Sequence, residues 1–155
     1  MKRCALLVGV NEYKGLNPLQ YARQDAESFA EMLQRCCGFE EHEITLMTCQ
    51  ATGATCAFSR FVEHALTDLT ERRDLDLLVF GFWGHGFAPE PGKRYLCGID
   101  TLENDLDRTA VPLDIVRAKL AQAGARDTLL VLDCCQNRPA GRGAAAAALE
   151  RGAEG

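Results

Sequence analysis

The chain has 155 residues, of which 47% are hydrophobic, and it carries a formal net charge of −5 at pH 7. This length suits one domain with a core of its own. The acidic balance provides no basic stripe to neutralise phosphates, which argues against a nucleic-acid partner. No apolar run approaches the length of about 20 residues that crosses a bilayer, so no membrane partner is predicted.

The eight cysteines show neither a CxxC pair nor a zinc-binding spacing with histidine. We therefore predict a cytoplasmic protein with no disulfide framework and no bound metal or other cofactor. Five of the cysteines are interpreted as inert core residues: Cys4, Cys36, Cys49, Cys56 and Cys97. The N-terminal MKRCALLVGV lacks a following small-residue cleavage pattern, so it is interpreted as a first strand and not as a signal peptide.

Strand-like apolar runs alternate with helical patterns along the chain. Strands are predicted at 4–10, 43–48, 76–84 and 128–133, with helices at 20–37, 57–69 and 112–120 and a short extended piece at 94–100. This alternation predicts an α/β fold, a mostly parallel sheet with helices on both faces. Active groups in such sheets gather at the carboxyl ends of the strands.

Residues 138–155, RPAGRGAAAAALERGAEG, contain almost no large apolar residue. We interpret them as a linker, which places the domain boundary after residue 137. Four predicted strands also make a narrow sheet, so we expect a piece of a longer protein.

Two motifs carry chemistry, and each follows a predicted strand. His85 lies between glycines in GHG, and the thiols of Cys134 and Cys135 follow Asp133 in LVLDCC. A thiol needs a base nearby, or a lowered pKa, to attack a carbonyl group at neutral pH. The two strand ends can supply that pair, and backbone N–H groups of Gly86 and of the cysteine can hold a developing oxyanion.

His85 and Cys135 are 50 residues apart, an interval known for caspases. Together with ALLVGVNEY, LQYARQDAESFAEML, LLVFGFWGHG and LLVLDCC, this spacing resembles the large-subunit region of caspase-like cysteine peptidases, nearest to metacaspases, over residues 3–137. The resemblance implies a caspase-like three-layer sandwich. It also implies a cysteine endopeptidase in a regulated proteolytic, cell-death or defence pathway.

The resemblance assigns roles residue by residue. Metacaspases carry Asp-Ser-Cys, so Cys135 matches the nucleophile and His85 the base, with Gly86 and Cys135 forming the oxyanion hole. Asp133 and Asp25 match acids of the substrate pocket, and two carboxylates in a partly dry pocket favour a basic residue, Arg over Lys. The substrate is expected to be a protein that is cut after this residue.

The chain departs from the family pattern at several positions. Trp83 replaces a serine two residues before the histidine, and Gln136-Asn137-Arg138 replaces His-Ser-Gly. The small subunit that completes the family's sheet is not recognisable after residue 137, so we expect it as a missing segment or chain. Arg138, Arg142 and Arg151 are candidate self-processing sites.

An alternative to the catalytic or binding role remains open for each motif. Asp133 can cap a loop, Asp25 can be an exposed helix charge, and His42 and His64 are interpreted as surface residues. The acidic residues from Asp100 to Asp107 could bind calcium, although their spacing matches no calcium loop. The domain could also be a catalytically silent scaffold or regulatory module. A flavodoxin-like binding protein is disfavoured because no phosphate-binding loop follows the first strand.

Overall fold

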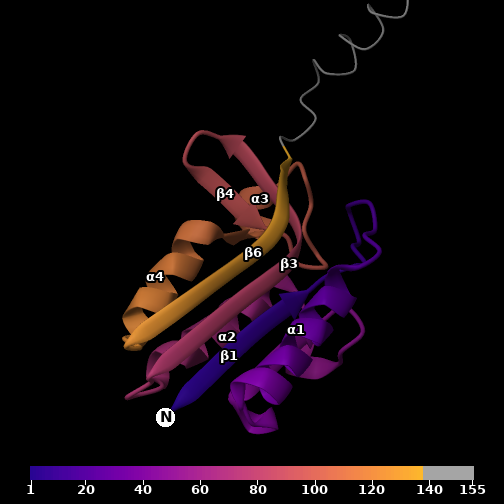
Figure 1. Cartoon of the computed structure of the whole chain (residues 1–155). Helices are drawn as coiled ribbons and strands as arrows, with labels where there is room; N and C mark the ends of the chain where they lie inside the picture. Colours follow the sequence, from indigo (N-terminus) through magenta and orange to yellow (C-terminus); the bar gives the residue numbers. More distant parts are fainter. Residues whose placement is uncertain (138–155) are drawn as a thin grey trace, which may run out of the picture.

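The computed structural model describes residues 1–137, which form one sheet covered by helices (Figure 1). The strands are β1 Arg3–Gly9, β2 Ile44–Thr48, β3 Leu77–Glu90, β4 Lys93–Leu96, β5 Val111–Pro112 and β6 Asp127–Asn137. The helices are α1 Ala22–Cys37, α2 Ser59–Glu71, α3 Leu106–Thr109 and α4 Leu113–Ala123. Two short 3₁₀ turns, η1 Glu41–Glu43 and η2 Gly53–Thr55, flank β2.

β3 is the central strand of the sheet. β1 pairs with it in parallel on one side and β6 in parallel on the other, while β2 continues the parallel sheet beyond β1. β4 pairs antiparallel with the last part of β3, and β5 pairs antiparallel with β4. The sheet is therefore mostly parallel, as the alternation of strands and helices predicted.

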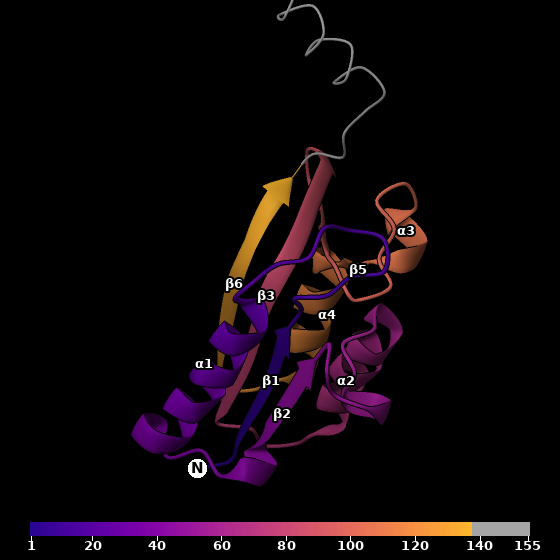
Figure 2. The ribbon, with the colours of Figure 1, turned by 90° about the vertical axis from the view of Figure 1, so that its right-hand side faces the viewer.

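The helices lie on both faces of the sheet (Figure 2). α1 covers one face, where Ala26 and Leu33 pack with Leu7, Val79 and Trp83. α2 and α4 cover the other face, and their apolar side chains pack on even-numbered residues of β1, β3 and β6. Side chains alternate between the faces of a strand, so a continuous apolar strand such as β1 supplies both cores. The predicted α/β sandwich is confirmed.

Helix α1 is fixed at both ends by groups from β1 and the loop that follows it. Gly38 ends the helix in the left-handed conformation at φ 70°. The Arg3 guanidinium donates to the carbonyl oxygens of Cys37, at 2.8 Å, and Gly38. At the other end, the Asn11 side chain accepts a hydrogen bond from the Arg23 N–H at 2.8 Å and donates to the Gln20 carbonyl at 3.0 Å. Asn11 therefore caps α1 in place of a helix residue.

The predicted ends of two strands were wrong. β3 continues through the GHG motif to Glu90 because β4 turns back and pairs with it, with Gly86 opposite Leu96. β6 continues through Asp133 to Asn137 because it stays paired with β3 along its whole length. Cross-strand pairing thus overrides the glycine and polar signals at these positions, and the motifs lie within strands instead of after them.

Candidate active site

The backbone brings His85 and Cys135 side by side. In the parallel pairing of β3 with β6, the Cα atom of His85 is the register partner of that of Cys135, while Gly84 is the partner of Cys134. The pairing is continuous from Leu77 to Phe87, so the register is set by the whole strand. Residues 50 positions apart in the sequence are thus neighbours across one ladder.

The imidazole of His85 is oriented by the loop between β1 and α1. Its Nε2 lies 2.9 Å from the backbone carbonyl oxygen of Asn17. A carbonyl oxygen only accepts hydrogen bonds, so this contact places the ring proton on Nε2 and leaves the lone pair on Nδ1. In this tautomer the histidine can take a proton through Nδ1.

Tyr13 holds the backbone and the ring of His85. Its hydroxyl accepts a hydrogen bond from the His85 N–H at 2.8 Å and donates to the Val10 carbonyl at 3.0 Å. Its ring lies 4.9 Å from the imidazole, centroid to centroid. Burial raises the pKa of Tyr13 above its ordinary value of 10.0, so the hydroxyl remains a neutral donor at physiological pH.

Sequence reasoning did not single out Tyr13, Asn17 or Asn11. The available signal was their position: NEYKGLNP follows the first strand at its carboxyl end, where the GHG and DCC motifs were also expected. Which loop atoms would reach the histidine depended on the path of the loop, which local patterns do not specify.

The described cysteines differ in their surroundings. Cys134 packs against the core on the α2 and α4 face and also borders the surface. Cys4 and Cys97 are fully buried, and burial raises the pKa of the Cys97 thiol to about 12, which keeps it protonated. Cys49 and Cys56 are half-buried. The core interpretation was wrong for Cys36, which lies exposed in the last turn of α1.

A cavity of about 210 Å³ lies where the first turn of α1 meets β3 and β6. Its lining includes Gln20, Tyr21, Asp25, Trp83, Asp133 and Cys134. The structure thus brings together the two acids that the sequence suggested for one pocket. Both carboxylates are exposed to solvent, so the expectation of a partly dry pocket was wrong for this chain. Among residues 1–137, no Lys or Arg forms an ion pair with either of them.

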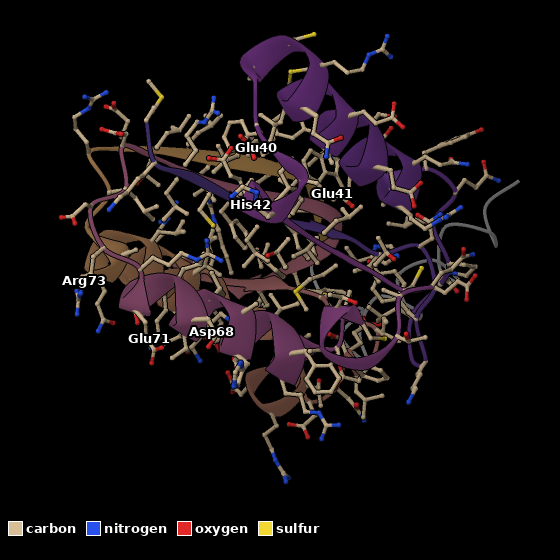
Figure 3. All side chains as sticks on the ribbon, turned by 90° about the horizontal axis from the view of Figure 1, so that it is seen from below. Glu40, Glu41, His42, Asp68, Glu71 and Arg73 are labelled. Carbon is tan, nitrogen blue, oxygen red and sulfur yellow. The ribbon has the colours of Figure 1, made fainter. Side chains whose placement is uncertain are left out.

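The other two histidines lie away from the cavity. His42 is in η1, at the end of the molecule seen in Figure 3, 3.4 Å from Glu40. His64 is on the surface of α2 and lies 3.2 Å from Asp68. Both side chains are highly exposed, so they fit the predicted surface role.

The acidic residues considered for calcium have structural contacts. Asp100 accepts a hydrogen bond from the Ser59 N–H at 2.9 Å, at the start of α2. Asp107 accepts one from the Tyr95 hydroxyl. Within the described part of the chain, no three His, Cys, Asp or Glu side chains are grouped so that they could hold a metal ion. The absence of a cofactor, with calcium activation left open, stays a prediction.

Comparison with known proteins identifies the protein family of this chain. The fold resembles that of the crystal structure of protein GSU0716 from Geobacter sulfurreducens, with a TM-score of 0.64 and 19% sequence identity over 89% of this chain. The chain spans about half, 52%, of that protein's length. The family model of the caspase domain matches residues 2–154, so the chain belongs to the caspase domain family. No curated protein matches the sequence significantly.

Two further predictions concern the C-terminal segment and membrane-spanning helices. The predicted linker at 138–155, with Arg138, Arg142 and Arg151, lies outside the described residues, and the family match extends across it to residue 154. The domain boundary at 137 therefore stays a prediction. In residues 1–137, no helix is long and apolar enough to cross a membrane.

Proposed function

We propose that this chain is the catalytic part of a cysteine endopeptidase that cuts proteins after a basic residue. The observation that carries the proposal is the register of β3 with β6, which makes His85 and Cys135 neighbours. The pairing favours Cys135 over Cys134, because Cys134 is opposite Gly84 and packs against the core of the other face. We place this activity in the cytoplasm, in regulated proteolysis such as cell death or defence.

In this mechanism Nδ1 of His85 takes the proton of the Cys135 thiol, and the thiolate attacks the carbonyl carbon of the scissile bond. The backbone N–H groups of Gly86 and Cys135 hold the oxyanion of the tetrahedral intermediate. The C–N bond breaks as the imidazolium gives its proton to the leaving amine. Water, deprotonated by His85, then cleaves the thioester, and the proton returns to the thiolate. The Asn17 carbonyl keeps the imidazole in the required tautomer throughout.

The cavity supports the basic specificity. Asp25 and Asp133 line it together, and neither is neutralised by a Lys or Arg among residues 1–137. The first turn of α1 also borders the cavity, and a helix N-terminus carries roughly half a positive charge. Two full negative charges outweigh that contribution, so a cationic side chain is favoured over an acidic one.

The edge of the sheet supports a partner that supplies further strands. Among the described strands, β6 pairs only with β3, so its outer edge has no partner there. Leu129 on this strand is 46% exposed, and Leu130, Val131 and Leu132 are half-buried. We propose that a small-subunit segment or chain pairs with this edge and completes the substrate groove.

The test is turnover of matched fluorogenic peptides ending in Arg, Lys or Asp, with and without calcium. The full chain, alone and together with the segment or chain that completes its groove, is compared with its Cys135→Ala and Cys134→Ala variants. We expect cleavage after Arg and Lys that is lost in Cys135→Ala and retained in Cys134→Ala. Cleavage after Asp would overturn the basic specificity. Loss of cleavage in Cys134→Ala alone would identify Cys134 as the nucleophile.

A catalytically silent scaffold is the second candidate. The open edge of β6 favours it, because a chain that needs further strands can serve as a binding module without turnover. Folded protein that binds a partner strand but cuts none of these peptides, alone or with that partner, would support the scaffold.

A further inference from the structure

We infer that Tyr21, at the rim of the cavity that Trp83 lines, makes this cavity selective for arginine over lysine by stacking on the planar guanidinium group. This inference rests on the proposed function, since it concerns the pocket for the basic residue. The carboxylates of Asp25 and Asp133 attract either cation. Discrimination between the two therefore needs a second feature of the cavity, and the aromatic side chain of Tyr21 provides it.

Trp83 forms a fixed wall of the cavity. Its side chain is only 6% exposed, and its ring lies 5.1 Å from that of Phe29 on α1, centroid to centroid. The indole also lies over Gly81 of the same strand: a Cβ atom at Gly81 would be 2.5 Å from a ring carbon. Packing between the sheet and α1 therefore holds the indole in place, with part of it on the cavity surface.

Tyr21 lies at the rim of the same cavity, immediately before α1. It is 65% exposed, although aromatic residues usually bury most of their surface. The segment that carries it is well anchored, because Asn11 binds the Gln20 carbonyl and the Arg23 N–H on either side. An exposed aromatic side chain on a fixed backbone is available for contact with a ligand.

The two cations differ in shape and in hydration, and an aromatic side chain distinguishes them by these properties. A guanidinium group is planar and weakly hydrated, so it can stack on a ring while its N–H groups point outward to carboxylates. The ammonium of lysine is compact and strongly hydrated, and it gains less from an aromatic face. The cavity combines both requirements for arginine: an aromatic face from Tyr21 beside the fixed wall of Trp83, and acceptors from Asp25 and Asp133.

The experiment uses the chain's own probe, because Trp83 is its single tryptophan. The fluorescence of Trp83 is followed while the full chain is titrated with the acetylated amides of arginine, lysine or citrulline. The terminal amide of these ligands is a bond that the proposed peptidase can cut, so each titration is repeated with the Cys135→Ala variant, in which the result is independent of turnover. We expect arginine to bind most tightly, lysine more weakly, and citrulline, which is planar but uncharged, least.

The decisive variants are Tyr21→Leu and Tyr21→Phe, with Ile115→Ala on α4 as a control that is 44% exposed on the opposite face. Tyr21→Leu should weaken arginine binding about threefold to fivefold and leave lysine binding unchanged. Tyr21→Phe should restore it, because the aromatic face is retained. Equal weakening for both cations, no weakening, or no fluorescence response to arginine would each overturn the inference. Selective binding without peptide turnover would support the aromatic pocket and count against the proposed peptidase activity.

Discussion

The chemistry of His85 depends on residues that precede it by about 70 positions in the sequence. Tyr13 binds its backbone N–H, and the Asn17 carbonyl binds its ring. These contacts come from the loop after β1, which crosses the carboxyl half of β3. A histidine flanked by glycines would otherwise have few neighbours to fix its orientation. The loop therefore belongs to the candidate site as positioning structure, although it supplies no reacting atom.

Tyr13→Phe should reduce kcat more than it changes KM. The variant keeps the ring but leaves the His85 N–H and the Val10 carbonyl without the hydroxyl, at a cost of about 1–3 kcal/mol in the free energy of unfolding. We expect kcat to fall roughly tenfold as the imidazole loses its position. Steady-state kinetics and urea unfolding measure the two effects.

Tyr95→Phe is the matched control, since it removes a hydroxyl that bonds to Asp107 in a buried tyrosine outside the proposed machinery. It should lower stability and leave kcat unchanged. If both variants lowered kcat equally, the effect would be one of general stability, and the positioning role of Tyr13 would be rejected.

At the scale of elements, the position of α1 decides the geometry of the cavity, because Asp25 lies in its first turn. Gly9 allows the helix to approach β1 closely: a Cβ atom there would be 2.7 Å from the Cβ of Ala26. At the far end, Arg3 ties the last carbonyl groups of the helix to β1, pairs with Glu43 at 3.3 Å and stacks on Phe39. β1 thus contacts the helix near its first turns and at its C-terminal end.

Arg3→Lys should lower the free energy of unfolding by about 1–3 kcal/mol. Lysine keeps the charge but cannot bind the carbonyl groups of Cys37 and Gly38 and the Glu43 carboxylate with one planar group. Arg35→Lys is the control, because Arg35 lies exposed in the last turn of the same helix. Urea unfolding measures the free energy of unfolding of both variants. Equal values for Arg3→Lys and Arg35→Lys would show that the charge of Arg3 alone accounts for its contribution.

At the scale of the molecule, the described chain presents one long apolar strand at the edge of its sheet. β6 has 11 residues and carries exposed or half-buried leucines on the two faces of its middle. An unpaired apolar edge is a template for pairing with another strand. This is why we expect the catalytic groove to depend on a further segment or chain.

Leu129→Lys should reduce association of the chain at high concentration, because a charge on an edge strand opposes pairing. Its effect on the free energy of unfolding should stay within about 0.5 kcal/mol, as is usual for an exposed site. Sedimentation velocity over a range of concentrations gives the result. Ile115→Lys, at a residue of similar exposure on α4, should associate like the original chain. Equal association of all three proteins would exclude the β6 edge as the contact.

The sequence by itself determined the type and order of the main elements. Their apolar patterns are local: period 3.6 in α1 and α2, and continuous runs in β1, β3 and β6 that are buried or partly buried on both faces. It also indicated His85 and the DCC motif as neighbours, since both were predicted at the carboxyl ends of parallel strands, although the structure places them within those strands. It did not predict α3, β5, or the continuation of β3 and β6, because short elements and strand ends depend on partners elsewhere in the chain.

Tertiary structure alone decided the register and the surroundings of the site. Pairing along the whole of β3 and β6 placed Cys135, and not Cys134, opposite His85. The path of the loop after β1 brought Tyr13 and Asn17 to the imidazole, and the packing of α1 placed Asp25 in one cavity with Asp133 and Trp83. These arrangements join segments that are far apart in the sequence. Local patterns specify whether each segment is a helix, a strand or a loop. The contacts between the segments are fixed by the packing of the whole sheet.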